Sequence, residues 1–363
     1  PILAYARITL PVEARPDWVM LALGLISLPL GYLSWRFVEQ PTRKRMSTRA
    51  VVGGSLAGFT AITAIGIGAS LHRPFIENIY MARLGEAGRA NYRLLPKPSE
   101  FENTLSGACR FRAEDADTDF EARFDTCLAE HGSAVMLIGG SHAGDLHGVL
   151  GSASDHPFLI SITKGFCRPH RRLAGPPPHA CHYEGIRDFL SRRGGDVALV
   201  LYTQPFFTLF DAYRDTRGTE GFHPELVDQT IAYLASLMPH VPVVMMGPRR
   251  TPGIDILRLS PREDIAAQVA RRYSPATGEA EDLADATFRA AAARAGVPYL
   301  SMIDLANQKM PEAIFVDGQL AYHDTDHLTA IGERHFGALL RRGLEADESA
   351  PAAKVRAVLF PPS

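Results

Sequence analysis

Ser141, Asp324 and His327 are the residues of this 363-residue chain whose types and order best suit nucleophilic chemistry. Ser141 ends an apolar run in AVMLIGGSHAGDL, and Asp324 and His327 form an Asp-x-x-His step in AYHDTDHLTAIG. A serine on a tight strand-to-helix turn can act as a nucleophile when a histidine takes its proton and a carboxylate orients that histidine. The three residues therefore predict a site for acyl transfer.

Each of these signals is weak by itself. A serine that follows a strand is more often a helix N-cap, and an isolated Asp-x-x-His step is usually a surface loop. The hypothesis requires both blocks to lie at the carboxyl ends of strands in one parallel sheet, where ligands bind. Two arginines after the fourth expected strand, Arg249 and Arg250, are interpreted as solvated, with contact to an anionic sugar as the alternative.

The elements that must position these residues are visible as short apolar runs separated by amphipathic segments. Continuous apolar strands of this kind are typical of a parallel sheet covered on both faces. We therefore predict an α/β fold, a three-layer α/β/α sandwich. The expected strands are 134–140, 158–163, 196–203, 241–248 and 297–302, and the expected helices lie within 224–238, 261–273, 279–296 and 328–344.

The amino-terminal part has a different composition. Two segments, at about 18–38 and 50–71, are apolar and long enough to span a bilayer. The short connection between them is basic, which predicts that it lies in the cytoplasm and that the rest of the chain lies outside it. The basic residues in and next to this connection are Arg36, Arg43, Lys44, Arg45 and Arg49.

These patterns predict four regions. They are a membrane region at 1–71, a linker and edge subdomain at 72–130, a catalytic domain at 131–346 and a tail at 347–363. The chain opens at Pro1 and reads like the interior of something longer, so we expect further membrane spans before it. The formal net charge of -2 gives no general reason to expect nucleic acid as a partner.

Four cysteines follow the second apolar segment. Cys109 with Cys127, and Cys167 with Cys181, would close short loops, and an oxidising compartment would keep such pairs joined. Four cysteines allow three connectivities, and four free thiols are the alternative. None of them forms a CxxC step, and no pattern of His, Cys and carboxylates requires a metal ion.

The two chemical blocks resemble a known family. GGSHAGD is similar to the Gly-Asp-Ser-His block of SGNH hydrolases and acyltransferases, and DTDHLT to their terminal Asp-x-x-His block. The upstream SWRFVEQPTRKR resembles the end of an acyltransferase family 3 membrane domain, which in such fusions leads to a periplasmic SGNH domain. The resemblance implies Ser141 as nucleophile, His327 as base and Asp324 as its partner.

The resemblance also implies an oxyanion hole made by the serine N–H, a glycine N–H and an asparagine amide. Gly165 is the candidate glycine, and Gln204 stands where the asparagine would be expected. Gly140 replaces the aspartate that the family usually has before its serine, so altered activity or a degenerate domain is an alternative.

The function implied is that of a bacterial inner-membrane O-acyltransferase, in particular an O-acetyltransferase, of lipopolysaccharide O-antigen, exopolysaccharide or another envelope glycan. The chain itself would bind no cofactor, and acetyl-CoA would supply the acyl group to the membrane domain preceding it. Two alternatives stay open. One is a membrane-anchored carbohydrate esterase, and the other is a non-catalytic module that positions the glycan.

Overall fold

The computed structural model describes residues 17–40, 47–96, 107–165, 168–169, 183–211 and 218–361. The chain divides into two compact units, residues 1–89 and residues 90–363. Arg43, Lys44 and Arg45 of the basic connection, together with Cys167 and Cys181, lie outside the described residues.

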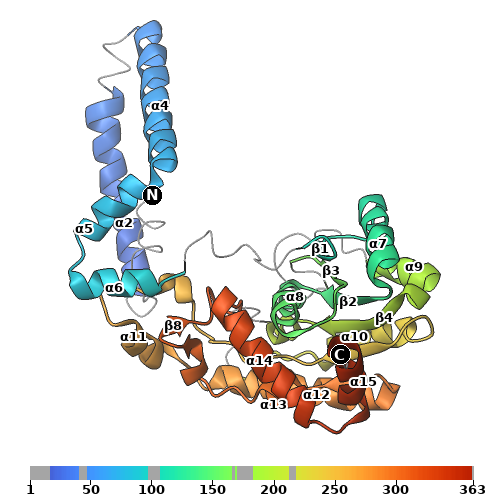
Figure 1. Ribbon diagram of the computed structural model, residues 1–363. Helices are drawn as coiled ribbons and strands as arrows, with labels where there is room; N and C mark the ends of the chain where they lie inside the picture. Colours follow the sequence, from blue (N-terminus) through green and yellow to red (C-terminus); the bar gives the residue numbers. More distant parts are fainter. Residues whose placement is uncertain are drawn as a thin grey trace. The chain divides into compact units, whose positions relative to one another are not determined.

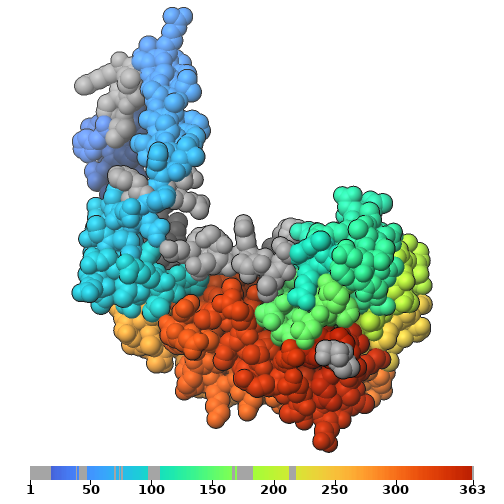
Figure 2. All heavy atoms as spheres, in the orientation of Figure 1, coloured from blue at the N-terminus to red at the C-terminus, as the bar shows by residue number. Residues whose placement is uncertain are grey.

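The described residues of the first unit are almost entirely helical. Two of its helical stretches, Trp18–Phe37 and Thr48–Gly68, are long and apolar enough to cross a membrane, with mean hydropathies of 1.6 and 1.8. None of the described large apolar side chains in these stretches is buried and most are exposed, and Figure 2 shows atoms of the second stretch at the molecular surface. The helices described in this unit are α2 (Asp17–Ser34), the π-helical η2 (Trp35–Glu39), α4 (Thr48–Leu71) and α5 (Arg73–Ala82), and α6 (Glu86–Leu94) spans the boundary at residue 89.

The second unit is built on a six-stranded sheet in which every neighbouring pair of strands is parallel. The strand order is β1-β3-β2-β4-β5-β6, so β2 lies between β3 and β4 near the middle. All six residues of β2 are buried, as expected for a strand covered on both faces. The strands are β1 (Arg110–Ala113), β2 (Ala134–Gly139), β3 (Leu159–Thr163), β4 (Val197–Thr203), β5 (Val243–Met246) and β6 (Tyr299–Leu300).

Helices cover both faces of this sheet, which confirms the predicted three-layer sandwich (Figure 1). One apolar core joins the sheet to α7 (Thr118–His131), α9 (Tyr183–Arg193), α10 (Pro224–Leu237) and α12 (Ala276–Ala295). The other joins it to α8 (Ser141–Ala153), α11 (Ile265–Arg272), α13 (Met302–Ala306), α14 (Ala330–Ala346) and α15 (Ala350–Leu359). Helix α12 ends at Gly296 in the left-handed conformation, as its sequence predicts.

Shorter elements connect these layers. The two-stranded hairpin of β7 (Phe315–Val316) and β8 (Gln319–Leu320) precedes the segment that carries Asp324 and His327. Its turn, Asp317-Gly318, has positive φ at both residues, which a tight hairpin requires. Four single turns of 3-10 helix complete the described part, namely η4 (Gly194–Asp196), η5 (Phe206–Leu209), η7 (Ile256–Arg258) and η8 (Glu312–Ile314).

The sheet unit extends beyond the boundaries that the sequence predicts for it. Strand β1 and helix α7 fall within the expected linker and edge subdomain, yet β1 pairs with β3. Only Phe111 of this edge strand is buried, so the sequence has no continuous apolar run there that would predict a strand. At the other end, α15 lies in the expected tail, and its buried Ala352, Val355 and Leu359 join the core beneath α14.

A disulfide links the segment just before edge strand β1 to helix α7. Cys109, just before β1, is bonded to Cys127 of α7, and their Cα atoms are 5.4 Å apart. The bond confirms this pair among the connectivities that the sequence leaves open. Closing a loop with a sequence separation of 18 residues stabilises a fold by roughly 3 kcal/mol in the chain-entropy view.

Candidate active site

The turn that carries Ser141 joins the central strand β2 directly to helix α8. Gly139 has a φ of +148°, and a Cβ there would lie 2.1 Å from the carbonyl oxygen of Thr203, so only glycine fits. Gly140 is the N-cap of α8 and Ser141, partly buried, is its first residue. Because first-turn N–H groups have no partner within a helix, they can bind an oxyanion at this point.

The segment that carries Asp324 and His327 is a short loop closed at its base. The N–H of Thr329 donates to the carbonyl of Ala321, and the Thr329 hydroxyl caps α14 by accepting from Gly332 N–H. A Cβ at Gly332 would lie 1.9 Å from the Ala321 oxygen, so a glycine is needed for this close approach. The start of α14 therefore fixes where the loop ends.

Asp324 and His327 form a hydrogen-bonded dyad within that loop. The distance from His327 Nδ1 to Asp324 Oδ2 is 2.7 Å. Asp324 Oδ1 accepts the backbone N–H groups of Asp326 and His327, at 2.9 and 2.8 Å. The carboxylate is thus held by its own turn, which leaves Nε2 of His327 as the nitrogen that can exchange a proton with a substrate or a nucleophile.

The structure brings the serine turn and this loop together. His142, the residue after Ser141, lies with its Nε2 3.1 Å from Asp326 Oδ2, and its ring centroid lies 6.0 Å from that of His327. Farther along α8, Asp145 Oδ2 accepts the N–H of Leu328 at 3.1 Å. The first turn and a half of α8 therefore contacts residues on both sides of His327.

A buried arginine completes this contact. Arg249, which follows β5, is only 1% exposed, and its Nη2 donates both to Asp145 Oδ2 and to the carbonyl oxygen of Asp326. The interpretation of Arg249 as a solvated side chain is therefore wrong, because a carboxylate and a backbone carbonyl from two distant segments bind it in the interior. Arg250 is half-buried and pairs with Glu281 and Asp282 instead.

These charges set the protonation of the dyad. Burial opposes the charged form of His327, but the Asp145 carboxylate and the hydrogen bond to Asp324 outweigh it and raise the pKa of His327 to about 9. For Asp324, burial would raise the pKa, whereas the hydrogen bond and charge of His327 bring it below the usual value. The dyad is therefore an imidazolium–carboxylate pair at neutral pH.

His142 has the opposite protonation. Burial, helped by the positive charge of Arg249, lowers the pKa of His142 to about 4 in spite of Asp326. Its Nδ1 has no partner among the described residues, so we assign the proton of the neutral ring to Nε2, which donates to Asp326. His142 thus contributes a neutral hydrogen-bond donor to the charged groups around His327.

The two residues expected to complete the oxyanion hole differ in their surroundings. Gly165 is exposed and lies two residues beyond β3, the strand paired with β2, and it stays a prediction. Gln204 is 1% exposed, and its Nε2 donates to Thr208 while its Oε1 accepts from Tyr202. We therefore correct the interpretation of Gln204, because its amide serves a buried hydrogen-bond network.

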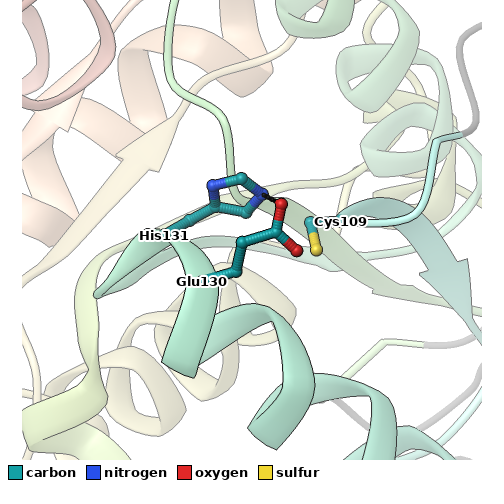
Figure 3. Close-up of side chains that lie close together, drawn as sticks. All are labelled: Cys109, Glu130 and His131. Carbon is teal, nitrogen blue, oxygen red and sulfur yellow. Dashed lines mark ion pairs between the residues drawn. The ribbon is translucent and has the colours of Figure 1, made fainter.

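Two groups of described side chains lie close enough to suggest a metal ion. In the first, Cys109, Glu130 and His131 come together beside β1 (Figure 3). The sulfur of Cys109 is already bonded to Cys127, so it offers no thiolate. The second group is the Asp324–His327 dyad with Asp326, whose donor atoms are engaged in the hydrogen bonds described above. We assign neither group as a metal site.

The chain is similar to one family of known sequence over most of its length. The sequence model of one family, described as an SGNH domain fused to AT3 domains, matches residues 108–342. The chain belongs to this family. The match begins just before β1 and ends within α14, so the SGNH domain contains the whole sheet and both chemical blocks. The predicted resemblance is confirmed, and the family implies a membrane acyltransferase domain in the same polypeptide.

Several solved structures are similar to the chain at low identity. The periplasmic domain of a lipopolysaccharide acetyltransferase from Salmonella ser. Paratyphi A is 14% identical, with a TM-score of 0.40, covering 73% of this chain and 99% of that one. An M. smegmatis aryl esterase is 15% identical, with a TM-score of 0.37 and coverages of 62% and 100%. A carbohydrate acetylesterase from Sinorhizobium meliloti is 13% identical, with a TM-score of 0.35 and coverages of 62% and 100%. No curated protein matches the chain.

Sequence reasoning missed the groups around His327 that come from other segments. Asp145 and Asp326 stand beside the motifs, four residues after Ser141 and one before His327, so their proximity in sequence was the available signal. Nothing in the sequence near Arg249 indicates that Asp145 and Asp326 would both bind it. These contacts form only when the SGNH domain is folded.

Proposed function

We propose that this protein is a membrane-anchored O-acyltransferase, in particular an O-acetyltransferase, of cell-envelope polysaccharide such as lipopolysaccharide O-antigen or exopolysaccharide. One observation carries the proposal. The Asp324–His327 dyad is held against the helix that begins with Ser141, in a domain of the family fused to AT3 domains. These are the parts that a serine acyl-enzyme mechanism requires.

In the first half-reaction, Ser141 Oγ attacks the carbonyl carbon of the acyl donor. His327 Nε2 takes the hydroxyl proton and returns it to the leaving group, while Asp324 holds the imidazole through Nδ1. The N–H groups of Ser141 and Gly165 bind the oxyanion. The products are the acylated serine and the released carrier.

In the second half-reaction, a sugar hydroxyl attacks the serine ester. His327 takes the proton of that hydroxyl and then protonates Ser141 Oγ as the ester bond breaks. The acyl group ends on the glycan and the serine is restored. The acceptor's hydroxyl replaces water, so the same residues would perform hydrolysis if water occupied the acceptor position.

The proposed topology places this chemistry outside the cytoplasm of a bacterial cell. Two apolar helices cross the inner membrane, the basic connection between them stays in the cytoplasm, and residues after about 71 lie in the periplasm. The AT3 domain would take acetyl from cytoplasmic acetyl-CoA and deliver it across the membrane. The SGNH domain would then need no cofactor of its own.

The decisive experiment replaces Ser141 with alanine in the whole membrane protein. We expect S141A to abolish glycan acylation, by roughly 10⁴-fold or more, because the nucleophile is lost. Mass spectrometry of the envelope glycan from cells carrying either form measures the acyl groups. As a control, S191A changes an exposed serine in α9 and should leave acylation unchanged.

The outcome also separates the alternatives. Unchanged acylation in S141A would contradict the catalytic role and support a module that only positions the glycan, an idea motivated by Gly140 in place of the usual aspartate. Incubating the purified wild-type protein with an acetylated donor and a glycan tests the esterase alternative. Release of free acetate without any acylated glycan would favour the esterase.

A further inference from the structure

We propose that Arg249 and Asp145 form a positioning pair that holds His327 in place against the serine helix. The inference rests on the proposed function, since it concerns how the base of that reaction is oriented. Arg249 comes from the segment after β5, and Asp145 lies one helical turn after Ser141 on α8. Neither residue belongs to the Ser-His-Asp trio.

The pair holds the backbone on both sides of His327. Arg249 Nη2 donates to the carbonyl oxygen of Asp326, the residue before the histidine. Asp145 Oδ2 accepts the N–H of Leu328, the residue after it, at 3.1 Å. Because Arg249 also bonds that same Asp145 oxygen, the two backbone contacts are joined through one ion pair. His327 therefore cannot shift along the loop without breaking the pair.

Burial argues that this pair is kept for something besides stability. Arg249 is 1% exposed and Asp145 is 9% exposed, so both charges have lost most of their contact with water. A buried ion pair often stabilises a fold no better than apolar side chains of the same volume would. A structural role alone would therefore be served as well by an apolar contact, whereas orienting the backbone polar groups around His327 requires donors and acceptors.

Asp145 also acts on the charge of His327, because its carboxylate raises the pKa of that imidazole against the effect of burial. The carboxylates that act on the imidazole are Asp145 from α8 and Asp324 and Asp326 from its own loop, and the rings of His142 and His323 lie beside it. Arg249 lies next to this group, bonded to Asp145 and to the carbonyl oxygen of Asp326. Removing the negative charge of Asp145 destabilises the imidazolium and lowers the pKa of His327. Removing the positive charge of Arg249 has the opposite effect and raises it.

Three substitutions separate orientation from charge. We expect R249M to lower kcat about 100-fold with KM little changed, because a displaced base loses its near-attack geometry. R249K keeps the charge, but the lysine side chain is shorter and places its ammonium away from the position of Nη2, where one nitrogen reaches both Asp145 Oδ2 and the carbonyl oxygen of Asp326. The kcat should therefore fall while the pKa of His327 stays near the wild-type value. D145N is nearly isosteric, and its amide oxygen can still accept from Leu328 N–H and from Arg249, so the two contacts are kept while the lost charge lowers that pKa by about one unit. Because Arg249 then stays buried without its counterion, the unfolding midpoint of D145N should fall, and the titration is run below that midpoint.

The pKa of His327 is measured in the whole protein in detergent by NMR of ¹³Cε1-labelled histidine, with the resonance assigned by its absence in H327Q. The inference expects opposite shifts in R249M and D145N. As a matched control, R258M removes an exposed arginine that pairs with Asp255, and should change neither kcat nor the pKa. If R249M fails to fold, D145N and R249K still provide both readouts.

The inference is overturned if D145N leaves the pKa of His327 unchanged and R249K leaves kcat unchanged. This failure differs from failure of the proposed function, which S141A reports through glycan acylation. S141A could abolish acylation while D145N leaves the pKa of His327 unchanged and R249K leaves kcat unchanged. In that case Ser141 would still be the nucleophile, but Arg249 and Asp145 would not position His327. The NMR titration requires no catalytic activity. It therefore tests whether Asp145 raises the pKa of His327 even if S141A still acylates the glycan and the proposed function fails.

Discussion

Two buried polar clusters lie beside the carboxyl ends of the strands, and they are built differently. The charged cluster surrounds His327 on the α8 face of the sheet and consists of His142, Asp145, Arg249, Asp324, Asp326 and His327. The neutral cluster surrounds Gln204 on the opposite face and consists of Tyr202, Gln204, Thr208 and Thr230.

The comparison shows that buried charges are placed around His327, whereas the cluster around Gln204 uses neutral groups only. Neutral hydrogen bonds satisfy buried groups at a net gain of about 1 kcal/mol each, with little effect on protonation elsewhere. Charged groups are costly to bury, and they shift the pKa of every titratable neighbour. The charged cluster therefore suits a site that must set the proton affinity of one imidazole, and the neutral cluster suits packing.

The largest effect should come from within the charged cluster, at the dyad itself. D324N keeps an oxygen that can cap the backbone N–H groups of Asp326 and His327, but it turns an amide toward His327 Nδ1 and favours the wrong tautomer. We expect kcat to fall about 10⁴-fold with little change in the thermal unfolding midpoint. D282N at an exposed aspartate is the control, and a loss of less than tenfold in D324N would contradict the dyad.

The pH dependence of acyl transfer is the next test of the charged cluster. The base must be neutral to take a proton, and the carboxylates around His327 raise its pKa from the ordinary 6.5 to about 9. The rate should therefore fall tenfold per pH unit below that pKa and rise as the pH increases toward it. The measurement is kcat/KM of the purified protein from pH 6 to 10. A midpoint near 6.5 would mean that these carboxylates do not act on the base.

The neutral cluster should respond in stability and not in catalysis. Q204L removes the acceptor of Tyr202 and the donor to Thr208, both buried, so we expect a loss of about 2 kcal/mol and a lower unfolding midpoint. The kcat of the remaining folded protein should change less than about threefold. A loss of 10²-fold or more in kcat would instead return Gln204 to the oxyanion hole.

The smallest effect should come from the edge of the neutral cluster. Y202F removes one hydroxyl that donates to Gln204 and keeps the ring in the core, so the expected cost is about 1 kcal/mol. The midpoint of thermal unfolding measures it, and the NMR titration of His327 should be unchanged. A shifted pKa of His327 would show that the two clusters communicate through the sheet.

The sequence predicts the elements well where local pattern decides them. Five apolar runs predict strands β2 to β6, and a helix expected over 279–296 ends at Gly296 as observed. It misses β1 because an edge strand buries only Phe111, and charged residues flank that position. Edge strands need no continuous apolar run, since one side of them has no partner strand.

The sequence by itself also determines the dyad, because Asp324 and His327 are three residues apart and their hydrogen bond forms within a single turn. Only the tertiary structure decides the surroundings of that dyad. Asp145 and Arg249 are separated by 104 residues, and Asp145 and Leu328 by 183, so no local pattern can predict that they meet. They meet because parallel strands bring their carboxyl ends to one edge of the sheet, whatever the distance along the chain.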